Sequence, residues 1–287
     1  MPEETLRGPL LLIGGAEDKV GGRTILNRFV RIAGGPAARI AVIATASAFY
    51  DLVGQRYVSL FTLLGAAHVE VLRVRDRAEA QRPEALEQLD SATGIFLTGG
   101  DQLKLTAILG GTPVAARIRE RHRAGCAVGG TSAGASAAPE HMLAYGASGI
   151  PPRKAMMQFA PGLGLIGGIV VDQHFGARGR AGRLMTAVAH NPGLLGIGLD
   201  EDTAIEIDPE DTLTVLGAGS VMIVDGAGMS YTDIHYVPEH APLTIFDMRV
   251  HVLAGGYHYD IPARAPLLPS APAHAHPEPG MVDGEGI

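Results

Sequence analysis

A serine in a glycine-rich turn is the first residue of this sequence whose surroundings suggest chemistry. Gly130, Ser132 and Gly134 fit the G-x-S-x-G pattern, directly after a short apolar segment at Cys126–Val128. In this pattern a strand turns sharply into a helix, and the serine hydroxyl is exposed at the bend. The helix start adds amide donors and a positive dipole end where an oxyanion would form. The pattern predicts a nucleophilic serine; the alternative is a small-residue turn without chemistry, because the five-residue pattern is permissive.

A serine hydroxyl needs a base to take its proton, and the base needs an acid to orient it. His174 is the best candidate base because it closely follows an apolar segment, Ile169–Val171, that reads as a strand. Glu201 is the candidate acid at the end of another expected strand, and Asp200 and Asp202 are its direct rivals. The order Ser, His, Glu along the chain differs from the Ser, Asp, His order of α/β-hydrolases, which disfavours that fold.

Two backbone positions supply candidate donors for an oxyanion, one in the serine turn itself and one in a second glycine turn. The first is the amide of Ala133, the residue after the nucleophile, and the second is the amide of Gly99 or Gly100. Amides aimed at the developing negative charge are usually a large part of such catalysis. The glycines at 99 and 100 are equally compatible with a simple turn.

The elements that must position these residues alternate along the chain. Strands are expected at residues 10–13, 40–45, 68–74, 94–98 and 126–129, and helices at residues 25–32, 51–64, 84–89 and 113–124. Several of the strands are near-continuous apolar runs, which indicates a mostly parallel sheet with helices on both faces. Sites in such sheets form at the carboxyl ends of the strands, so the residues above are expected at one edge of a single sheet.

The second half of the chain continues this pattern and then changes. A strand at 169–171, a helix at 181–190 and strands at 195–199 and 204–207 are expected, and later short strands at 213–216, 221–224, 243–246 and 250–253 read as a sheet extension. Residues 1–262 are expected to form a single α/β domain, and residues 263–287 a Pro-, Ala- and Gly-rich tail that is draped on the surface or disordered.

Composition restricts the classes of function. The chain has 287 residues with 46% hydrophobic and 18% charged, and a net charge of −7, so a soluble globular protein without a nucleic-acid surface is expected. No apolar run has the length of a membrane span or a signal peptide, and the cytoplasm is the expected location. No cofactor and no metal site are expected, since a single cysteine is present and His274 and His276 of the tail offer at most adventitious binding.

Two other features are predicted to be structural. Gly162–Gly167 satisfies G-x-G-x-x-G, but a dinucleotide site needs that run after a strand and at the start of a helix, and here a strand is expected to follow it. Cys126 lies inside the strand that leads to Ser132, and we expect it to be a core residue.

Five segments in order resemble the cyanophycinase family of serine peptidases, which is related to the aspartyl dipeptidases. They are Ile13–Lys19, Gly99–Gln102, Gly130–Ala135, Asp172–Phe175 with Arg178, Arg180 and Arg183, and Asp200–Ala204. The resemblance covers about residues 9 to 225. It implies a fold like that of class I glutamine amidotransferases (flavodoxin-like), a homodimer, and a triad of Ser132, His174 and Glu201.

The implied substrate is cyanophycin, a polyaspartate backbone with arginine on each β-carboxyl, which is cut to β-aspartyl-arginine dipeptides. Each substrate unit offers a carboxylate and a guanidinium. The candidate partners are Arg178, Arg180 and Arg183 for carboxylates, Glu17, Asp18, Asp101 and Asp172 for guanidinium groups, and Gln102 and Gln173 for backbone amides. Two alternatives stay open: a dipeptidase for aspartyl or isoaspartyl dipeptides, and a catalytically inactive amidotransferase-like binding protein.

Overall fold

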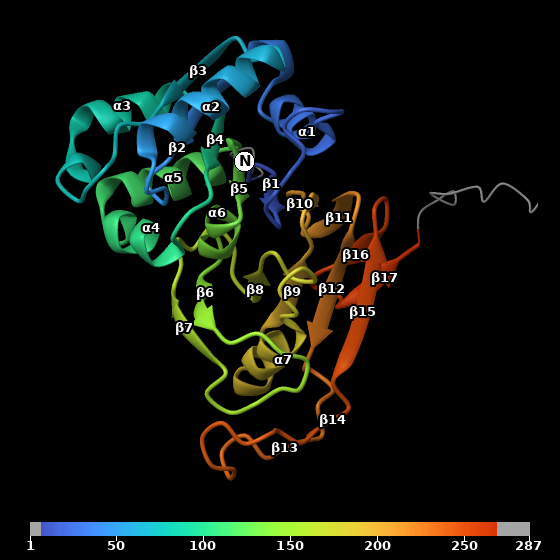
Figure 1. The fold of residues 1–287 in the computed structure, drawn as a ribbon. Helices are drawn as coiled ribbons and strands as arrows, with labels where there is room; N and C mark the ends of the chain where they lie inside the picture. The colour runs from blue at the N-terminus through green and yellow to red at the C-terminus, as the bar shows by residue number, and fades with distance from the viewer. Residues whose placement is uncertain (1–6, 269–287) are drawn as a thin grey trace, which may run out of the picture.

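The computed structural model describes residues 7–268, and its largest unit is a nine-stranded sheet in the order β17-β16-β11-β10-β1-β5-β4-β2-β3 (Figure 1). The parallel part consists of β1 (Leu10–Ile13), β5 (Ala127–Thr131), β4 (Gly94–Leu97), β2 (Arg39–Ile43) and β3 (His68–Val71). Antiparallel strands extend it beyond β1, namely β10 (Thr203–Ile207), β11 (Thr212–Gly217), β16 (His258–Asp260) and β17 (Ala265–Leu267).

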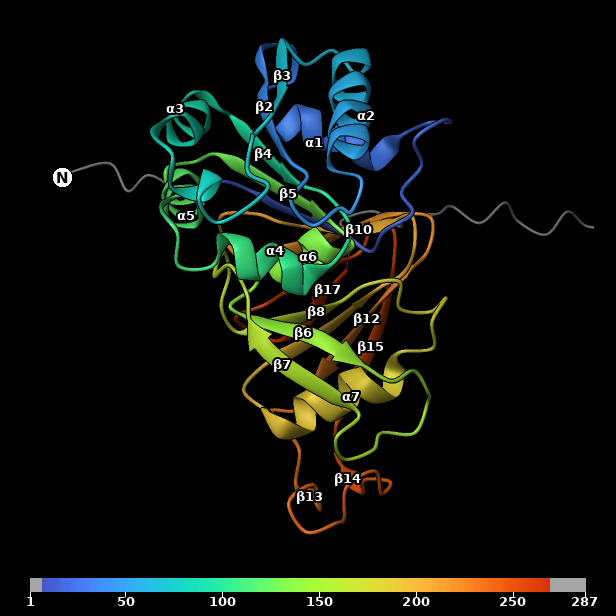
Figure 2. The same ribbon diagram turned by 60° about the vertical axis from the view of Figure 1, so that its left-hand side comes forward.

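Helices cover both faces of the parallel strands because those strands are apolar on both faces. In β1, Leu10 and Leu12 point to one side and Leu11 and Ile13 to the other, and all four are buried. The side of Leu11 packs against α1 (Thr24–Ile32) and α2 (Tyr50–Leu63). The side of Leu10 packs against α3 (Pro83–Ser91), α4 (Gln102–Leu109), α5 (Pro113–Arg123) and α6 (Ala133–Ala137) (Figure 2). The expected mostly parallel α/β architecture is confirmed.

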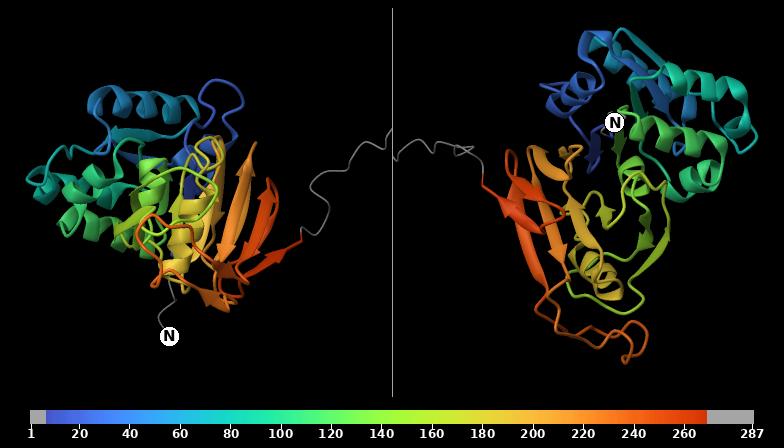
Figure 3. Two further views of the ribbon diagram at one scale, coloured as in Figure 1. Left: turned by 60° about the horizontal axis from the view of Figure 1, so that its bottom comes forward. Right: turned by 180° about the vertical axis from the view of Figure 1, so that it is seen from behind.

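A second, four-stranded sheet lies against the first. Its strands are β15 (Arg249–Ala254), β12 (Ser220–Asp225), β9 (Leu195–Leu199) and β8 (Ile169–Asp172). One face joins the same core as α3–α6, and the other packs on α7 (Ala181–His190) and on the hairpin of β6 (His141–Gly146) and β7 (Met157–Pro161). Figure 3 shows the orange and red strands gathered away from the blue and green helices. Short elements complete the chain: η1 (Gly35–Ala37), η2 (Glu79–Gln81), β13 (Tyr231–Thr232) and β14 (Ile245–Phe246).

The second sheet corrects the expectation that all the site residues follow strands of one sheet. The strands before His174 and Glu201, β8 and β9, pair with each other in parallel and belong to the smaller sheet. The turn at residues 200–202 then carries the chain from β9 into β10 of the larger sheet. The two sheets therefore meet at the turn that contains Glu201.

The end of the domain also differs from the expected boundary at residue 262. Arg264 pairs with the buried Asp225, and β17 at Ala265–Leu267 extends the larger sheet at its edge. The remainder of the expected tail, with His274 and His276, lies outside the described residues. Among residues 7–268, no helix combines the length and the apolar character that crossing a bilayer requires.

Candidate active site

Ser132 stands at the bend where β5 turns into α6. Its backbone has φ 51° and ψ −110°, a left-handed conformation that is unusual for a residue with a side chain. The bend is tight because α6 starts directly above the neighbouring strand: a Cβ atom on Gly134 would lie 2.7 Å from the Cβ of Leu97. Ser132 N donates to the Ile13 carbonyl at 2.9 Å, which fixes the turn to β1.

Three side chains form a hydrogen-bonded row across the two sheets. The Oγ of Ser132 lies 3.0 Å from Nε2 of His174, and Nδ1 of His174 lies 2.6 Å from Oε1 of Glu201. The rival carboxylates are used elsewhere. Asp200 accepts from Gly176 N and from the hydroxyl of Ser220, and Asp202 accepts from Asp18 N. Of the three consecutive acids, Glu201 is the one that reaches the imidazole.

The loop after β1 holds the two sheets in register at this row. Its carbonyls accept from residues that follow strands of the smaller sheet: Gly14 O from His174 N at 2.8 Å, and Gly15 O from Asp202 N at 2.9 Å. Gly15 has φ 99°, and a Cβ atom there would lie 2.5 Å from Nε2 of His174. Glycine is therefore required at this position both for the backbone conformation and for the space that the imidazole occupies.

Of the expected oxyanion donors, Gly99 lies beside Ser132 and Ala133 follows it in the chain. A Cβ atom on Gly99 would be 3.3 Å from the Cβ of Ser132, so this glycine borders the nucleophile directly. In residues 7–268, no protein acceptor is hydrogen-bonded to the backbone N–H of Gly99, Gly100 or Ala133. These amides have capacity to bind a negatively charged oxygen.

The cluster of Asp172, Arg180 and Arg183 differs from the sequence-based expectation. Asp172 is fully buried; it accepts from Nε of Arg183 at 2.6 Å and also from Nη2 of Arg183 and Nη1 of Arg180. Burial, with a smaller effect of the neighbouring Arg183 and Arg178 cations, lowers the pKa of Arg180 to about 10 although Asp172 opposes it. The three charges pair with one another inside the protein, although the buried Nε of Arg180 has no partner among the described residues. They therefore do not present the free charges expected for substrate carboxylates and guanidinium groups.

Arg178 is the arginine that stays exposed, and within residues 7–268 its side chain makes no hydrogen bond or ion pair. The Oε1 of Gln173 lies 3.3 Å from the Oγ of Ser132, so its amide borders the row. Gln102 instead donates to the Ala144 carbonyl at 2.8 Å. Arg178 is thus the exposed one of the expected arginines, and Gln173 is buried directly beside Ser132.

Two of the acids expected to bind substrate guanidinium groups are also engaged by the protein itself. Asp101 is exposed and caps α4 by accepting from Leu103 N. Asp18 accepts from the backbone N–H groups of Arg23, Val20 and Gly21, and these bonds lower its pKa to about 2. Both carboxylates therefore have structural roles in loops at the edge of the site, and each keeps an exposed surface.

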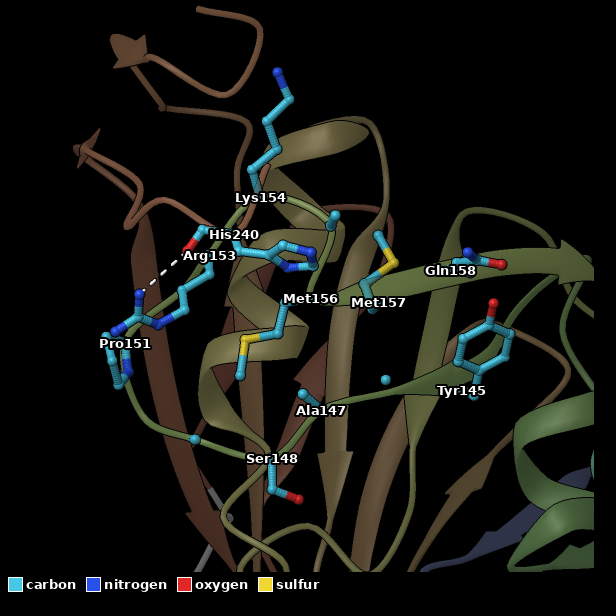
Figure 4. A pocket seen from close by; sticks show the side chains of 13 residues that line it. Tyr145, Ala147, Ser148, Pro151, Arg153, Lys154, Met156, Met157, Gln158 and His240 are labelled. Atoms are coloured by element: carbon cyan, nitrogen blue, oxygen red, sulfur yellow. Dashed lines mark hydrogen bonds between the residues drawn. The ribbon is translucent and has the colours of Figure 1, made fainter. Parts of the chain in front are cut away.

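A pocket of about 240 Å³ lies at the loop end of the β6–β7 hairpin (Figure 4). It is lined by residues between Tyr145 and Gln158 and by His240. Figure 4 shows Lys154 pointing away from it, and its Nζ donates to the Val237 carbonyl. None of the sequence-predicted site residues lines this pocket, so it is separate from the row. Among residues 7–268, no group of three or more His, Cys, Asp or Glu side chains is placed to hold a metal ion.

Cys126 is expected to be unreactive in the folded protein. It is 3% exposed, and burial raises the pKa of its thiol to about 11, so almost no thiolate forms near neutral pH. We expect iodoacetamide at pH 8 to leave the native protein without a mass increase and to alkylate it fully in denaturant. Alkylation of the native protein with loss of activity would instead indicate a thiol at the site.

The α/β architecture and the row of serine, histidine and glutamate at a strand-to-helix turn define a hydrolase of the serine peptidase class. The chain belongs to peptidase family S51, whose family model matches residues 10–215.

Relatives and solved structures agree with this family. The chain is 44% identical over 266 residues to a cyanophycinase of Geminocystis herdmanii (strain PCC 6308), covering 92% of this chain and 98% of the relative. It is also 44% identical to a cyanophycinase of Trichormus variabilis (strain ATCC 29413 / PCC 7937), covering 90% of this chain and 87% of the relative. The fold is shared with a peptidase from an acI-B1 Actinobacterium at a TM-score of 0.65 and 21% identity, covering 90% of this chain and 98% of that one.

Two elements that border the site, α4 and the β6–β7 hairpin, are absent from the sequence-based expectations. Asp101 at the start of α4 is a recognisable capping residue, followed by Gln102–Leu109 with three leucines, so a signal for this helix is present. The strands of the hairpin are joined by a ten-residue loop at residues 147–156. Because the sequence has no short turn motif there, it gives no signal for a hairpin. The G-x-G-x-x-G run at 162–167 is a loop between β7 and β8, as predicted.

Proposed function

We propose that this protein is a cyanophycinase, a serine exopeptidase that hydrolyses the polyaspartate backbone of cyanophycin and releases β-aspartyl-arginine. The observation that carries the proposal is the 44% identity to proteins of this activity across nearly their whole length, 98% of the Geminocystis herdmanii relative. The hydrogen-bonded row of Ser132, His174 and Glu201 supports it, because this is the arrangement that activates a serine.

In the proposed reaction, Ser132 Oγ attacks the scissile carbonyl while Nε2 of His174 takes its proton. Glu201 holds Nδ1–H of the imidazole and stabilises the imidazolium that forms. The amides of Gly99 and Ala133 bind the oxyanion of the tetrahedral intermediate, with Gly100 as a further donor. His174 then protonates the leaving amine, and water, activated by the same histidine, hydrolyses the acyl-enzyme.

We propose that Arg178 binds a substrate carboxylate, since it is exposed and lies four residues after His174. Gln173 is proposed to contact the substrate backbone beside Ser132, and Asp101 to attract a substrate guanidinium at the edge of the site. Family resemblance supports a homodimer, and the composition supports a cytoplasmic location without a nucleic-acid partner.

The test is incubation of the purified protein with purified cyanophycin, followed by mass analysis of the products. Release of β-aspartyl-arginine is expected, with little cleavage of isolated aspartyl or isoaspartyl dipeptides. Cleavage of the dipeptides with an intact polymer would favour a dipeptidase. If neither substrate is cleaved and a fluorophosphonate does not label Ser132, the result would favour a catalytically inactive binding protein.

A further inference from the structure

Glu17 is a buried carboxylate that neither the row nor the proposed substrate contacts use. It is 3% exposed and belongs to the loop that follows β1. From the sequence it is expected among the residues that hold a substrate guanidinium, but its side chain points into the protein, behind the bend that carries Ser132. Burying a carboxylate is costly unless it is paired and hydrogen-bonded, so its partners indicate what it is retained for.

The partners of Glu17 come from three segments. Its Oε2 accepts from the hydroxyl of Thr131 at 2.7 Å, and Thr131 is the residue directly before Ser132. Its Oε1 accepts from the hydroxyl of Tyr57 in α2 and pairs with Nζ of Lys19 at 2.9 Å. Burial, reinforced by the Glu17 carboxylate, raises the pKa of Tyr57 well above its ordinary value, so this hydroxyl stays protonated and donates.

The same loop also holds the backbone around the row. Ile13 O accepts from Ser132 N, and Gly14 O accepts from His174 N. Ala16, directly before Glu17, is left-handed with φ 50°, which turns the chain so that Glu17 faces inward while Asp18 N donates to Asp202. The bend at Ser132 is thus fixed to the end of β1 by the backbone bond from Ser132 to Ile13, and to the loop that follows by the side-chain bond from Thr131 to Glu17.

We propose that Glu17 is a positioning residue for Ser132: its carboxylate holds Thr131, and thereby the left-handed backbone from which the Oγ of Ser132 reaches His174. This inference rests on the proposed function in one respect, that Ser132 is the nucleophile. Without the Thr131 bond, the bend at Ser132 is free to relax toward a less strained conformation. The distance from Ser132 Oγ to Nε2 of His174, now 3.0 Å, is then expected to increase.

The test separates positioning from stability by measuring the nucleophile directly. Glu17→Gln keeps the size of the side chain but offers one acceptor where two donors and a cation converge. We expect kcat on cyanophycin to fall about 10²-fold, the typical effect of a small misplacement, with an unchanged KM. The rate at which a fluorophosphonate labels Ser132 is expected to fall by the same factor, because this small reagent needs no polymer contacts.

Variants of Thr131 test the same hydrogen bond from its other side. Thr131→Val keeps the branched shape and loses the hydroxyl, so labelling is expected to slow as in Glu17→Gln. Thr131→Ser keeps the hydroxyl and is expected to label near the wild-type rate. The double variant Glu17→Gln with Thr131→Val is expected to be no slower than the slower single variant, because both remove one interaction. If Glu17→Gln does not fold, the comparison of the labelling rates of Thr131→Val and Thr131→Ser still tests the inference.

The matched control is Glu79, another buried carboxylate, 8% exposed and bonded to Arg75 N at 2.7 Å. Its partners belong to segments that do not carry the row, so Glu79→Gln is expected to lower the melting temperature and leave labelling unchanged. Labelling of folded Glu17→Gln and Thr131→Val at the wild-type rate would overturn the inference alone. A wild-type protein that is not labelled at Ser132 would overturn the proposed function, and this inference with it.

Discussion

Ser132→Ala is expected to abolish release of β-aspartyl-arginine while the protein stays folded. Removing the nucleophile of a serine peptidase triad lowers kcat by roughly 10⁶-fold, because histidine and acid have no effect without it. The alanine side chain is smaller than serine and needs no new space, so the far-ultraviolet circular dichroism and the melting temperature are expected to match the wild type. The measurement is dipeptide release from purified cyanophycin under saturating polymer.

Cys126→Ser serves as the control for this experiment, since it alters a buried residue directly before β5 that carries no proposed chemistry. It is expected to retain its turnover. Dipeptide release by Ser132→Ala at more than a trace of the wild-type rate would mean that another group attacks the substrate.

Asp172→Ala is expected to destabilise the folded protein strongly. It removes the carboxylate that two buried guanidinium groups share, Arg180 and Arg183, and leaves both without their charge partner. Breaking a buried ion pair from one side typically costs about 3–5 kcal/mol of unfolding free energy. For a domain of this size that corresponds to a decrease in melting temperature of roughly 6–20 °C. Thermal unfolding followed by circular dichroism measures it.

A surface ion pair with similar geometry is the control. Arg75 and Asp51 lie 2.6 Å apart, with side chains 48% and 75% exposed. Asp51→Ala is expected to cost less than about 1 kcal/mol, because water screens the charges in both states. Equal decreases in melting temperature for Asp172→Ala and Asp51→Ala would show that the Asp172 ion pairs are not important for stability. The cluster would then again be a candidate substrate site.

The elements that can be predicted from the sequence are those whose signals are local. The bend at Ser132 is recognisable because Gly130 and Gly134 are needed wherever a strand and a helix approach this closely. The parallel strands are recognisable as apolar runs, and the edge where Gly14, Gly99 and Ser132 gather follows from the parallel pairing of β1, β4 and β5.

The parts that cannot be predicted depend on contacts between distant segments. Nothing in residues 169–172 indicates which sheet they join, since an apolar strand pairs equally well in either. The arginines at 180 and 183 read as free charges at the start of α7, because their burial depends on β8 and the β6–β7 hairpin, where Asp172 and the Gly146 carbonyl accept from Arg183. The role of Glu17 is hidden for the same reason, as Tyr57 and Thr131 lie far from it along the chain.

The division of the row between two sheets has a consequence for how its rate can be adjusted. His174 and Glu201 follow β8 and β9, two neighbouring strands of the small sheet, whereas Ser132 follows β5 of the large one. A shift of one sheet against the other would change the distance between the Ser132 oxygen and the imidazole, and the backbone bonds from His174 and Asp202 to the loop after β1 oppose such a shift. Substitutions between the two sheets that weaken these bonds are therefore expected to lower the turnover rate without changing the residues that bind the polymer.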